Sequence, residues 1–258
     1  MSERLERWLI SLGALGEHEL RVATARRQLY EGAAFDTAEA LHELCVRAES
    51  ERAVAREALF AIVPVVADPA HVERMSLVRE ASKRHHLHSA CRMLRCTTKK
   101  GHRLERGEGD EPLRTPVMSA DPSLSLGERR ALARRPSRQL LQKVLADPHP
   151  MVASILLGNP RVTEDDVVTM AASRRAEREV LSMIAMRQVR SARVRIAVVS
   201  NPNTPPAVSV PLLYLLLRPE LADVAHAPSL PAVVRTTAHE LWELRPPMPP
   251  GEAPELVH

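Results

Sequence analysis

The feature that most constrains this chain is a helix that ends at a proline and is followed at once by a second helix. In residues 193–208, RVRIAVVSNPNTPPAV, Val194 and Val198 lie four apart and share one helical face. Pro202 disfavours the helical conformation at the residue before it, so the helix has to end there. Thr204 is a favourable N-cap for a second helix with proline at its first position. The segment predicts two short helices joined by a tight turn.

Two further segments repeat this pattern. Residues 151–167 align without gaps and place the Asn-Pro pair of 159–160 where 201–202 stands, with Thr163 as the cap. In residues 221–234 the sequence APSLP replaces NPNTP, so the asparagine is lost and the cap is weaker. Helix pairs that recur along a chain are typical of stacked repeats, because no single unit buries its apolar face alone.

These repeats resemble the leucine-rich repeat variant family and, more loosely, HEAT-like repeats. The matching residues are Val194-Arg195, Asn201-Pro202, Thr204-Pro205, Leu145-Ala146-Asp147-Pro148 and Asn159-Pro160. The resemblance covers about residues 121–245 and implies an all-α fold, an α-solenoid of short stacked helices, but no single activity. The step from Pro160 to Pro202 is longer than the family's step, so we expect one irregular or lengthened unit there.

Four regions are predicted along the chain. Residues 1–96 read as an N-terminal helical domain, residues 97–120 as a polar linker, residues 121–245 as the helical repeat array and residues 246–258 as a proline-rich flexible tail. Two residues each of Trp, Tyr and Phe leave the core to aliphatic side chains, which suits helix-on-helix packing.

Composition also bounds the environment. The longest apolar run, residues 58–67, is about half a membrane span and contains Pro64, so no transmembrane helix and no membrane partner are expected. No leader sequence is recognised at the N-terminus. Three cysteines are too few, and odd in number, for a disulfide framework, which favours a reducing compartment. We therefore expect a cytoplasmic location.

One cluster contains metal-ligand residue types: His85, His88, Cys91 and Cys96 within KRHHLHSACRMLRC. On one continuous helix Cys96 would lie about 16 Å from His85, too far for one zinc ion; a break between two helices would weaken this objection. The chain has no H-E-x-x-H, G-x-S-x-G, P-loop or G-x-G-x-x-G motif. We expect no catalytic residues, no metal and no cofactor.

Arginine is the remaining lead. Residues 119–200 carry 14 Lys and Arg against 8 Asp and Glu, a net charge of +6. Arg193 and Arg195 are expected to reach water at the edges of their helix. The candidate partner-binding residues are Arg134, Arg135, Arg138, Arg174, Arg175, Arg178, Arg190 and Arg193.

These arginines allow three interpretations: a solvated face with local ion pairs, a surface for an acidic protein, or a surface for nucleic-acid phosphates. The scarcity of aromatic residues disfavours readers of single strands, which stack bases on such side chains. We predict a non-catalytic scaffold or adaptor that binds a protein partner, with nucleic-acid binding through residues 129–195 as the alternative.

Overall fold

The computed structural model describes residues 3–50, 52–102, 124–135, 137–145 and 149–247. Over these residues the protein is helical and contains no β-strand, which confirms the all-α prediction. The N-terminal part consists of α1 (Glu3–Gly13), α2 (His18–Tyr30), α3 (Ala34–Glu49), α4 (Ala53–Ala67), a 3-10 turn η1 (Pro69–His71), α5 (Val72–Arg84) and α6 (His88–Met93).

The central helix of this part is α4. Its sequence, AVAREALFAIVPVVA, is apolar on nearly every side, and all of its last seven residues are buried. Such a helix has to be covered all round. Helices α1, α2 and α3 pack against it from the N-terminal part, and α11 and α13 pack against it from the C-terminal part. Because α4 touches both parts, the buried residues form one continuous core.

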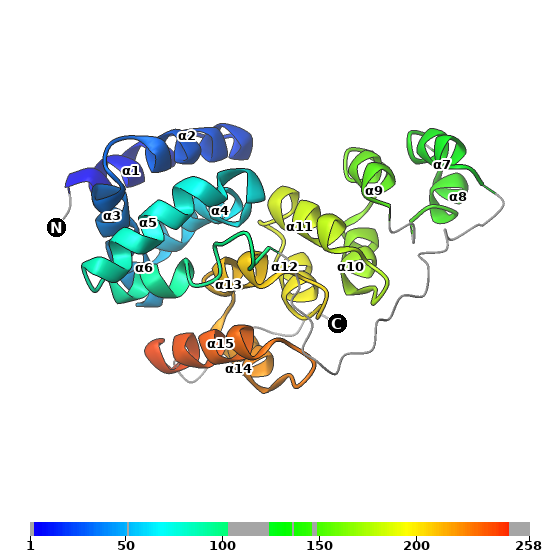
Figure 1. Ribbon diagram of the computed structural model, residues 1–258. Helices are drawn as coiled ribbons and strands as arrows, with labels where there is room; N and C mark the ends of the chain where they lie inside the picture. Colours follow the sequence, from blue (N-terminus) through cyan, green and yellow to red (C-terminus); the bar gives the residue numbers. More distant parts are fainter. Residues whose placement is uncertain (1–2, 51, 103–123, 136, 146–148, 248–258) are drawn as a thin grey trace.

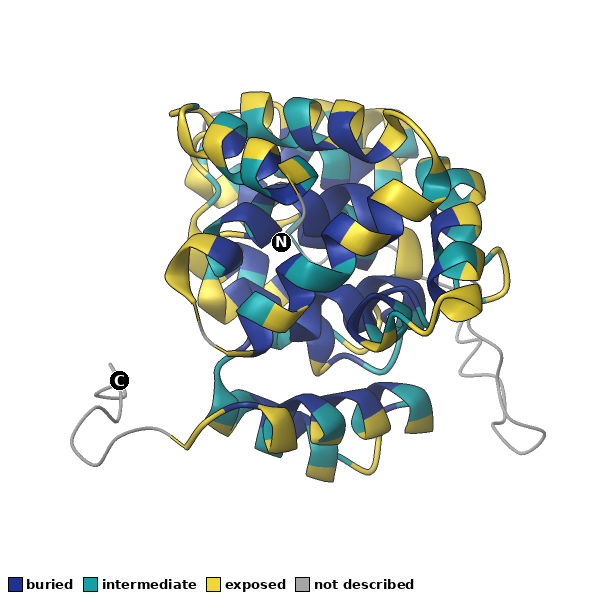
Figure 2. Ribbon diagram, turned by 90° about the vertical axis from the view of Figure 1, so that its left-hand side faces the viewer, coloured by how far each residue is buried: buried dark blue, intermediate teal, exposed yellow. Residues whose placement is uncertain are grey.

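Within the described residues, the C-terminal part contains nine short helices: α7 (Leu126–Ala133), α8 (Arg138–Gln142), α9 (Pro150–Leu156), α10 (Glu164–Ala172), α11 (Arg178–Arg187), α12 (Ala192–Val199), α13 (Pro206–Leu213), α14 (Arg218–His226) and α15 (Ala232–Leu244). In Figure 1, α7 and α8 lie at the end of the molecule farthest from α1 and α2, and the chain returns through α9–α12 to place α13 beside α4. The outer helices bury one face and expose the other (Figure 2).

A capping contact recurs three times in this part. The Asn159 amide, after α9, donates to the carbonyls of Ala133 and Arg135 at the end of α7, at 2.8 and 3.1 Å. The Asn201 amide, after α12, donates likewise to Ala171 and Ser173 at the end of α10, at 2.7 and 2.8 Å. In each case an asparagine that follows one helix caps the C-terminal end of the helix two elements earlier, where the last carbonyls have no intrahelical partner.

The third contact uses a different residue. The Arg245 guanidinium, after α15, donates to the carbonyls of Tyr214 and Leu216 at the end of α13. We therefore group the helices into a first unit (α7–α9), a second unit (α10–α12) and a third unit (α13–α15). The second helices of the units begin at Arg138, Arg178 and Arg218, steps of 40 residues.

These contacts correct two sequence-based readings. The 42 residues from Pro160 to Pro202 are the spacing of one three-helix unit and not a lengthened step. Residues 221–234 do form a helix, a turn and a helix, but they lie one helix too early to match the Asn-Pro turns, whose counterpart is Arg245.

The two predicted caps differ in outcome. Thr163 caps α10, with its hydroxyl accepting from the Asp166 amide and the Asp166 carboxylate accepting in return. Thr204 is not a cap: α13 begins two residues later, at Pro206, and the Thr204 hydroxyl donates to the carbonyl of Val198 in α12 at 2.6 Å. Because two prolines, Pro205 and Pro206, follow Thr204, the second helix begins beyond the threonine.

Thr97 to His102 are the described part of the predicted linker, and Thr97 is fully buried there. The remainder, residues 103–120, lies outside the described residues, as does the predicted tail beyond residue 247. No helix in the described part is both long and apolar enough to cross a membrane.

Candidate functional site

The predicted arginines divide into two groups. Arg134 and Arg135 follow α7, Arg174 and Arg175 follow α10, and all four are exposed. The two turns occupy equivalent places. Arg135 supplies one of the carbonyls that Asn159 caps, and Arg174 directly follows Ser173, whose carbonyl Asn201 caps. Among the described residues, the side chains of Arg135, Arg174 and Arg175 have no hydrogen-bond or ion-pair partner, and Arg134 donates to the Arg130 carbonyl. We call these four residues the arginine turns.

The other four arginines form ion pairs within the fold. Arg138 binds both carboxylate oxygens of Asp166 and so joins α8 to α10. Arg193 reaches Asp165 at 2.6 Å and joins α12 to the same helix. These pairs use the acidic first turn of α10, where a helix favours negative charge.

Two arginines of this second group bind glutamates. Arg190 contacts Glu57 of α4 at 3.0 Å, which links the array to the N-terminal part. Arg178 contacts the neighbouring Glu179 at 2.7 Å. The predicted set is therefore not one continuous free face, since half of it is engaged in bonds with the protein itself.

Arg195 corrects the expectation that it reaches water. It is 6% exposed, and its guanidinium donates to the carbonyls of Val189 and Arg190 at 2.8 and 2.9 Å. The guanidinium groups of Arg195 and Arg190 lie over the Phe60 ring of α4, 5.1 and 5.2 Å from its centre. Burial lowers the pKa of Arg195. Arg195 is thus part of the junction between α12 and α4.

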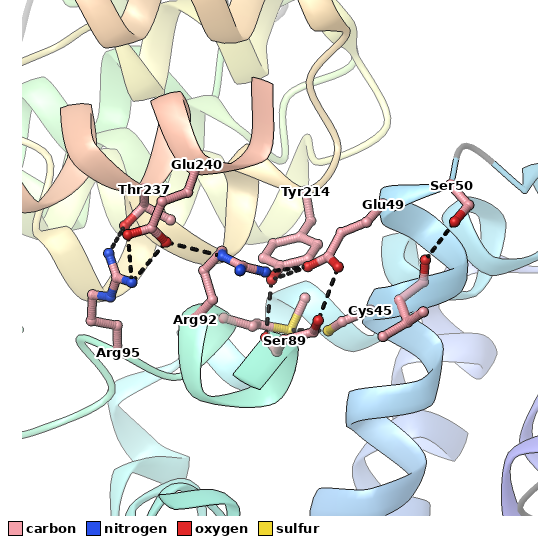
Figure 3. Close-up of polar contacts among 11 residues, drawn as sticks. Cys45, Glu49, Ser50, Ser89, Arg92, Arg95, Tyr214, Thr237 and Glu240 are labelled. Atoms are coloured by element: carbon pink, nitrogen blue, oxygen red, sulfur yellow. Dashed lines mark hydrogen bonds and ion pairs between the residues drawn. The ribbon is translucent and has the colours of Figure 1, made fainter. Parts of the chain in front are cut away.

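A buried polar cluster, which the sequence reading missed, joins the third unit to the N-terminal part (Figure 3). Glu49, at the end of α3, accepts from Arg92 of α6 at 2.6 Å and from the Ser89 hydroxyl at 2.9 Å. The Tyr214 hydroxyl lies 3.1 Å from Glu49 Oε1. Arg92 also contacts Glu240 of α15 at 3.0 Å. We call this set the buried cluster.

Arg95 extends the buried cluster at its outer end. It donates to both oxygens of Glu240, at 2.8 and 3.0 Å, and to the Thr237 hydroxyl at 2.9 Å. Burial alone would raise the pKa of Glu240, but the hydrogen bonds from Arg95 and Arg92 outweigh it and hold the pKa below its usual value. Glu240 is therefore charged at neutral pH and anchors α15 to α6.

The Tyr214 hydroxyl and the nearby Cys45 thiol stay neutral at the Glu49 end of the buried cluster. Burial raises the pKa of Tyr214 and of Cys45 well above their usual values. The Cys45 thiol lies 3.8 Å from the Met93 sulfur. A neutral, buried thiol is a poor nucleophile, so this end of the cluster is suited to packing and not to thiol chemistry. One sequence signal was available: a tyrosine within the apolar run PLLYLLL needs a hydroxyl partner when it is buried.

The histidine and cysteine cluster breaks into two helices. Helix α5 ends at Arg84, and His86 adopts a positive φ of 56° before α6 begins at His88. The objection based on one continuous helix is therefore removed. Within the described part of the chain, however, no three His, Cys, Asp or Glu side chains come together in a way that could hold a metal ion.

Comparison of the chain with protein-family models, curated proteins and solved structures gives no match. The resemblance to the leucine-rich repeat variant family stays a prediction from the residues that carry it. The arginine turns and the buried cluster are accordingly interpreted from their own geometry.

Proposed function

We propose that this protein is a non-catalytic scaffold of the α-solenoid type, which binds an acidic protein segment through the arginine turns. The observation that carries the proposal is the placement of Arg134, Arg135, Arg174 and Arg175: exposed, without carboxylate partners among the described residues, and on equivalent turns of successive units. Guanidinium groups recognise carboxylates through paired, charge-assisted hydrogen bonds. The odd number of cysteines supports a reducing, cytoplasmic setting.

The contrast with the paired arginines supports this choice. Arg138 and Arg193 already bind carboxylates of the neighbouring helix, and that arrangement serves the fold. The arginine turns lack such a carboxylate among the residues that the structure describes, although acidic residues are common in this chain. An external carboxylate is the ligand that such groups can still accept.

A protein partner is favoured over single-stranded nucleic acid because of where the aromatic rings lie. Tyr214 is fully buried and Trp242 is half-buried, with Arg218 over its ring at 4.9 Å, so the described residues of the C-terminal part contain no exposed Trp, Tyr or Phe side chain. Proteins that bind single strands combine positive charge with aromatic surfaces on which bases stack. Here the charge is present without those surfaces.

Co-purification with a matched charge control tests the proposal. The first variant reverses the arginine turns, with Arg134, Arg135, Arg174 and Arg175 each changed to Glu. The control reverses four exposed cations of the N-terminal part, with Arg26, Arg52, Lys83 and Arg84 each changed to Glu. We expect an acidic protein to be recovered with the wild type and the control after nuclease treatment, and to be lost with the first variant. Equal loss in both variants, or recovery of nucleic acid alone, would contradict the proposal.

A further inference from the structure

A hollow of about 740 Å³ lies between α1 and α2, on the N-terminal part and away from the arginine turns. Its lining residues are Arg4, Arg7, Trp8, Ser11, Arg27, Gln28, Tyr30 and Glu31. Three arginines against one glutamate give it positive charge, although residues 1–66 as a whole carry 8 Lys and Arg against 11 Asp and Glu. Its volume is in the range of small-molecule sites in proteins.

One wall of the hollow is held in place. The Arg4 guanidinium donates to the carbonyls of Gln28 and Glu31, lies 3.7 Å from Asp36 and sits 5.8 Å from the centre of the Trp8 ring. These contacts fix Arg4, and the ion pair with Asp36 offsets part of its charge. A ligand would therefore meet a guanidinium that does not have to rearrange, which favours binding.

The other two cations are free to bind. Arg7 and Arg27 are exposed, come from facing helices and have no side-chain partner among the described residues. Two guanidinium forks around one concave site match the geometry of a phosphate group.

The floor and rim add polar and aromatic groups. Gln28 is 6% exposed, and its Oε1 has no hydrogen-bond partner in the described structure, as is true of Arg4 Nε. At the rim, Tyr30 is exposed, and a hydrogen bond of 3.0 Å to His71 holds its ring. A ring held in this way offers a flat surface for stacking.

We propose that this hollow binds a phosphate monoester of a small ring compound, with Arg7 and Arg27 on the phosphate and Tyr30 against the ring. The same phosphate chemistry occurs on lipid headgroups. The net negative charge of the surrounding N-terminal residues opposes an anionic membrane surface and favours a small soluble ligand.

Calorimetric titration with adenosine 5′-monophosphate and with inorganic phosphate tests the proposal on the full chain. We expect the nucleotide to bind one to one and more tightly than phosphate. Arg7→Ala and Arg27→Ala should each weaken nucleotide binding about tenfold or more. Arg26→Ala, which changes the exposed neighbour on α2 outside this lining, should change it less than about twofold. Equal effects of all three variants, or no binding at millimolar nucleotide, would overturn the proposal.

Two further arms separate the ring and the source of the phosphate. Tyr30→Ala should reduce nucleotide affinity to that of inorganic phosphate, whereas Tyr30→Phe, which keeps the ring but loses the hydrogen bond to His71, should reduce it less. Sedimentation with phosphatidylcholine vesicles containing phosphatidylinositol 4-phosphate should show no binding. Vesicle binding that depends on Arg7 and Arg27, without nucleotide binding, would show that the ligand is a lipid and refute the soluble one.

Discussion

The first and third units have the same capping geometry but opposite surroundings. In the first unit, Asn159 caps α7, and the adjoining turn carries Arg134 and Arg135 in solvent. In the third unit, Arg245 caps α13, and the equivalent turn carries Leu215 and Leu216, both fully buried.

Helix α4 accounts for the difference. Arg56 of α4 donates to the carbonyl of Leu215, so the N-terminal part covers this turn in the third unit. The same kind of backbone contact therefore supports an exposed, charged turn in the first unit and a buried, apolar turn in the third. What differs is the neighbouring helix, and a turn that no other helix of the described residues covers is available to a partner.

The largest expected effect comes from breaking the attachment of the third unit. Glu49→Gln removes a charge whose side chain is 9% exposed and leaves Arg92 without its closest carboxylate. Losing one partner of a buried pair is strongly destabilising, so we expect a loss of about 3 kcal/mol in the free energy of unfolding by urea denaturation.

Arg138→Gln is the matched change in the first unit, where the arginine side chain is 47% exposed. Its effect should be clearly smaller than that of Glu49→Gln. Equal losses would mean that the third unit is held no more tightly than the first.

The next effect concerns the cap of α13. Arg245→Ala leaves two carbonyls at the buried end of this helix without their donor, because Arg245 is 2% exposed. Unsatisfied buried carbonyls predict a loss of about 2 kcal/mol in the free energy of unfolding. Circular dichroism should show retained helix content below the transition. A variant as stable as the wild type would show that this contact does not contribute to the free energy of unfolding.

The asparagine caps allow a direct comparison between units. Asn201→Ala removes two bonds to α10 at a residue that is 3% exposed, and we expect a loss of about 2 kcal/mol. Asn159→Ala removes the same two bonds at the outer unit. Its effect should appear mainly as faster amide hydrogen exchange confined to α7 and α9, because the outer unit has fewer neighbours. Global destabilisation equal to that of Asn201→Ala would contradict this difference.

A smaller, pH-dependent effect is expected between the first two units. The Arg138 guanidinium, followed by the Thr163 amide and hydroxyl, holds the pKa of Asp166 at about 2, below its usual value. A lowered carboxyl pKa contributes stability at pH above the unfolded-state value, about 4, and this contribution is lost as the pH falls towards 2. Asp166→Asn should therefore be less stable than the wild type at pH 6, with the difference shrinking by pH 2. A difference independent of pH would contradict the role of this carboxylate.

Much of the local structure follows from sequence, because its causes are local. Thr163 and Asp166 lie three residues apart and form the predicted cap, and proline ends α12 where expected. The all-α class follows from the same signals. The predicted length of the repeating unit was wrong. The contact that defines the unit joins Asn201 to Ala171, 30 residues earlier, and helix periodicity does not reveal it.

The candidate sites also combine local features that the sequence predicts with contacts between remote residues that it does not. Exposure of Arg134, Arg135, Arg174 and Arg175 agrees with the sequence reading. Burial of Arg195 against Phe60 could not be foreseen, because Phe60 lies 135 residues earlier in the chain. The pairing of Glu49 with Tyr214 is equally remote, separated by 165 residues.

The most direct test of the central claim is fluorescence anisotropy with a labelled oligoglutamate peptide and, in parallel, a labelled DNA duplex. We expect the wild type to bind the peptide, and the variant with Glu at 134, 135, 174 and 175 to lose that binding while its melting temperature stays close to that of the wild type, since exposed charges contribute little to stability. The charge-matched control at 26, 52, 83 and 84 should bind as the wild type does. Peptide binding that survives reversal of the arginine turns, or tighter binding of the duplex than of the peptide, would contradict the account.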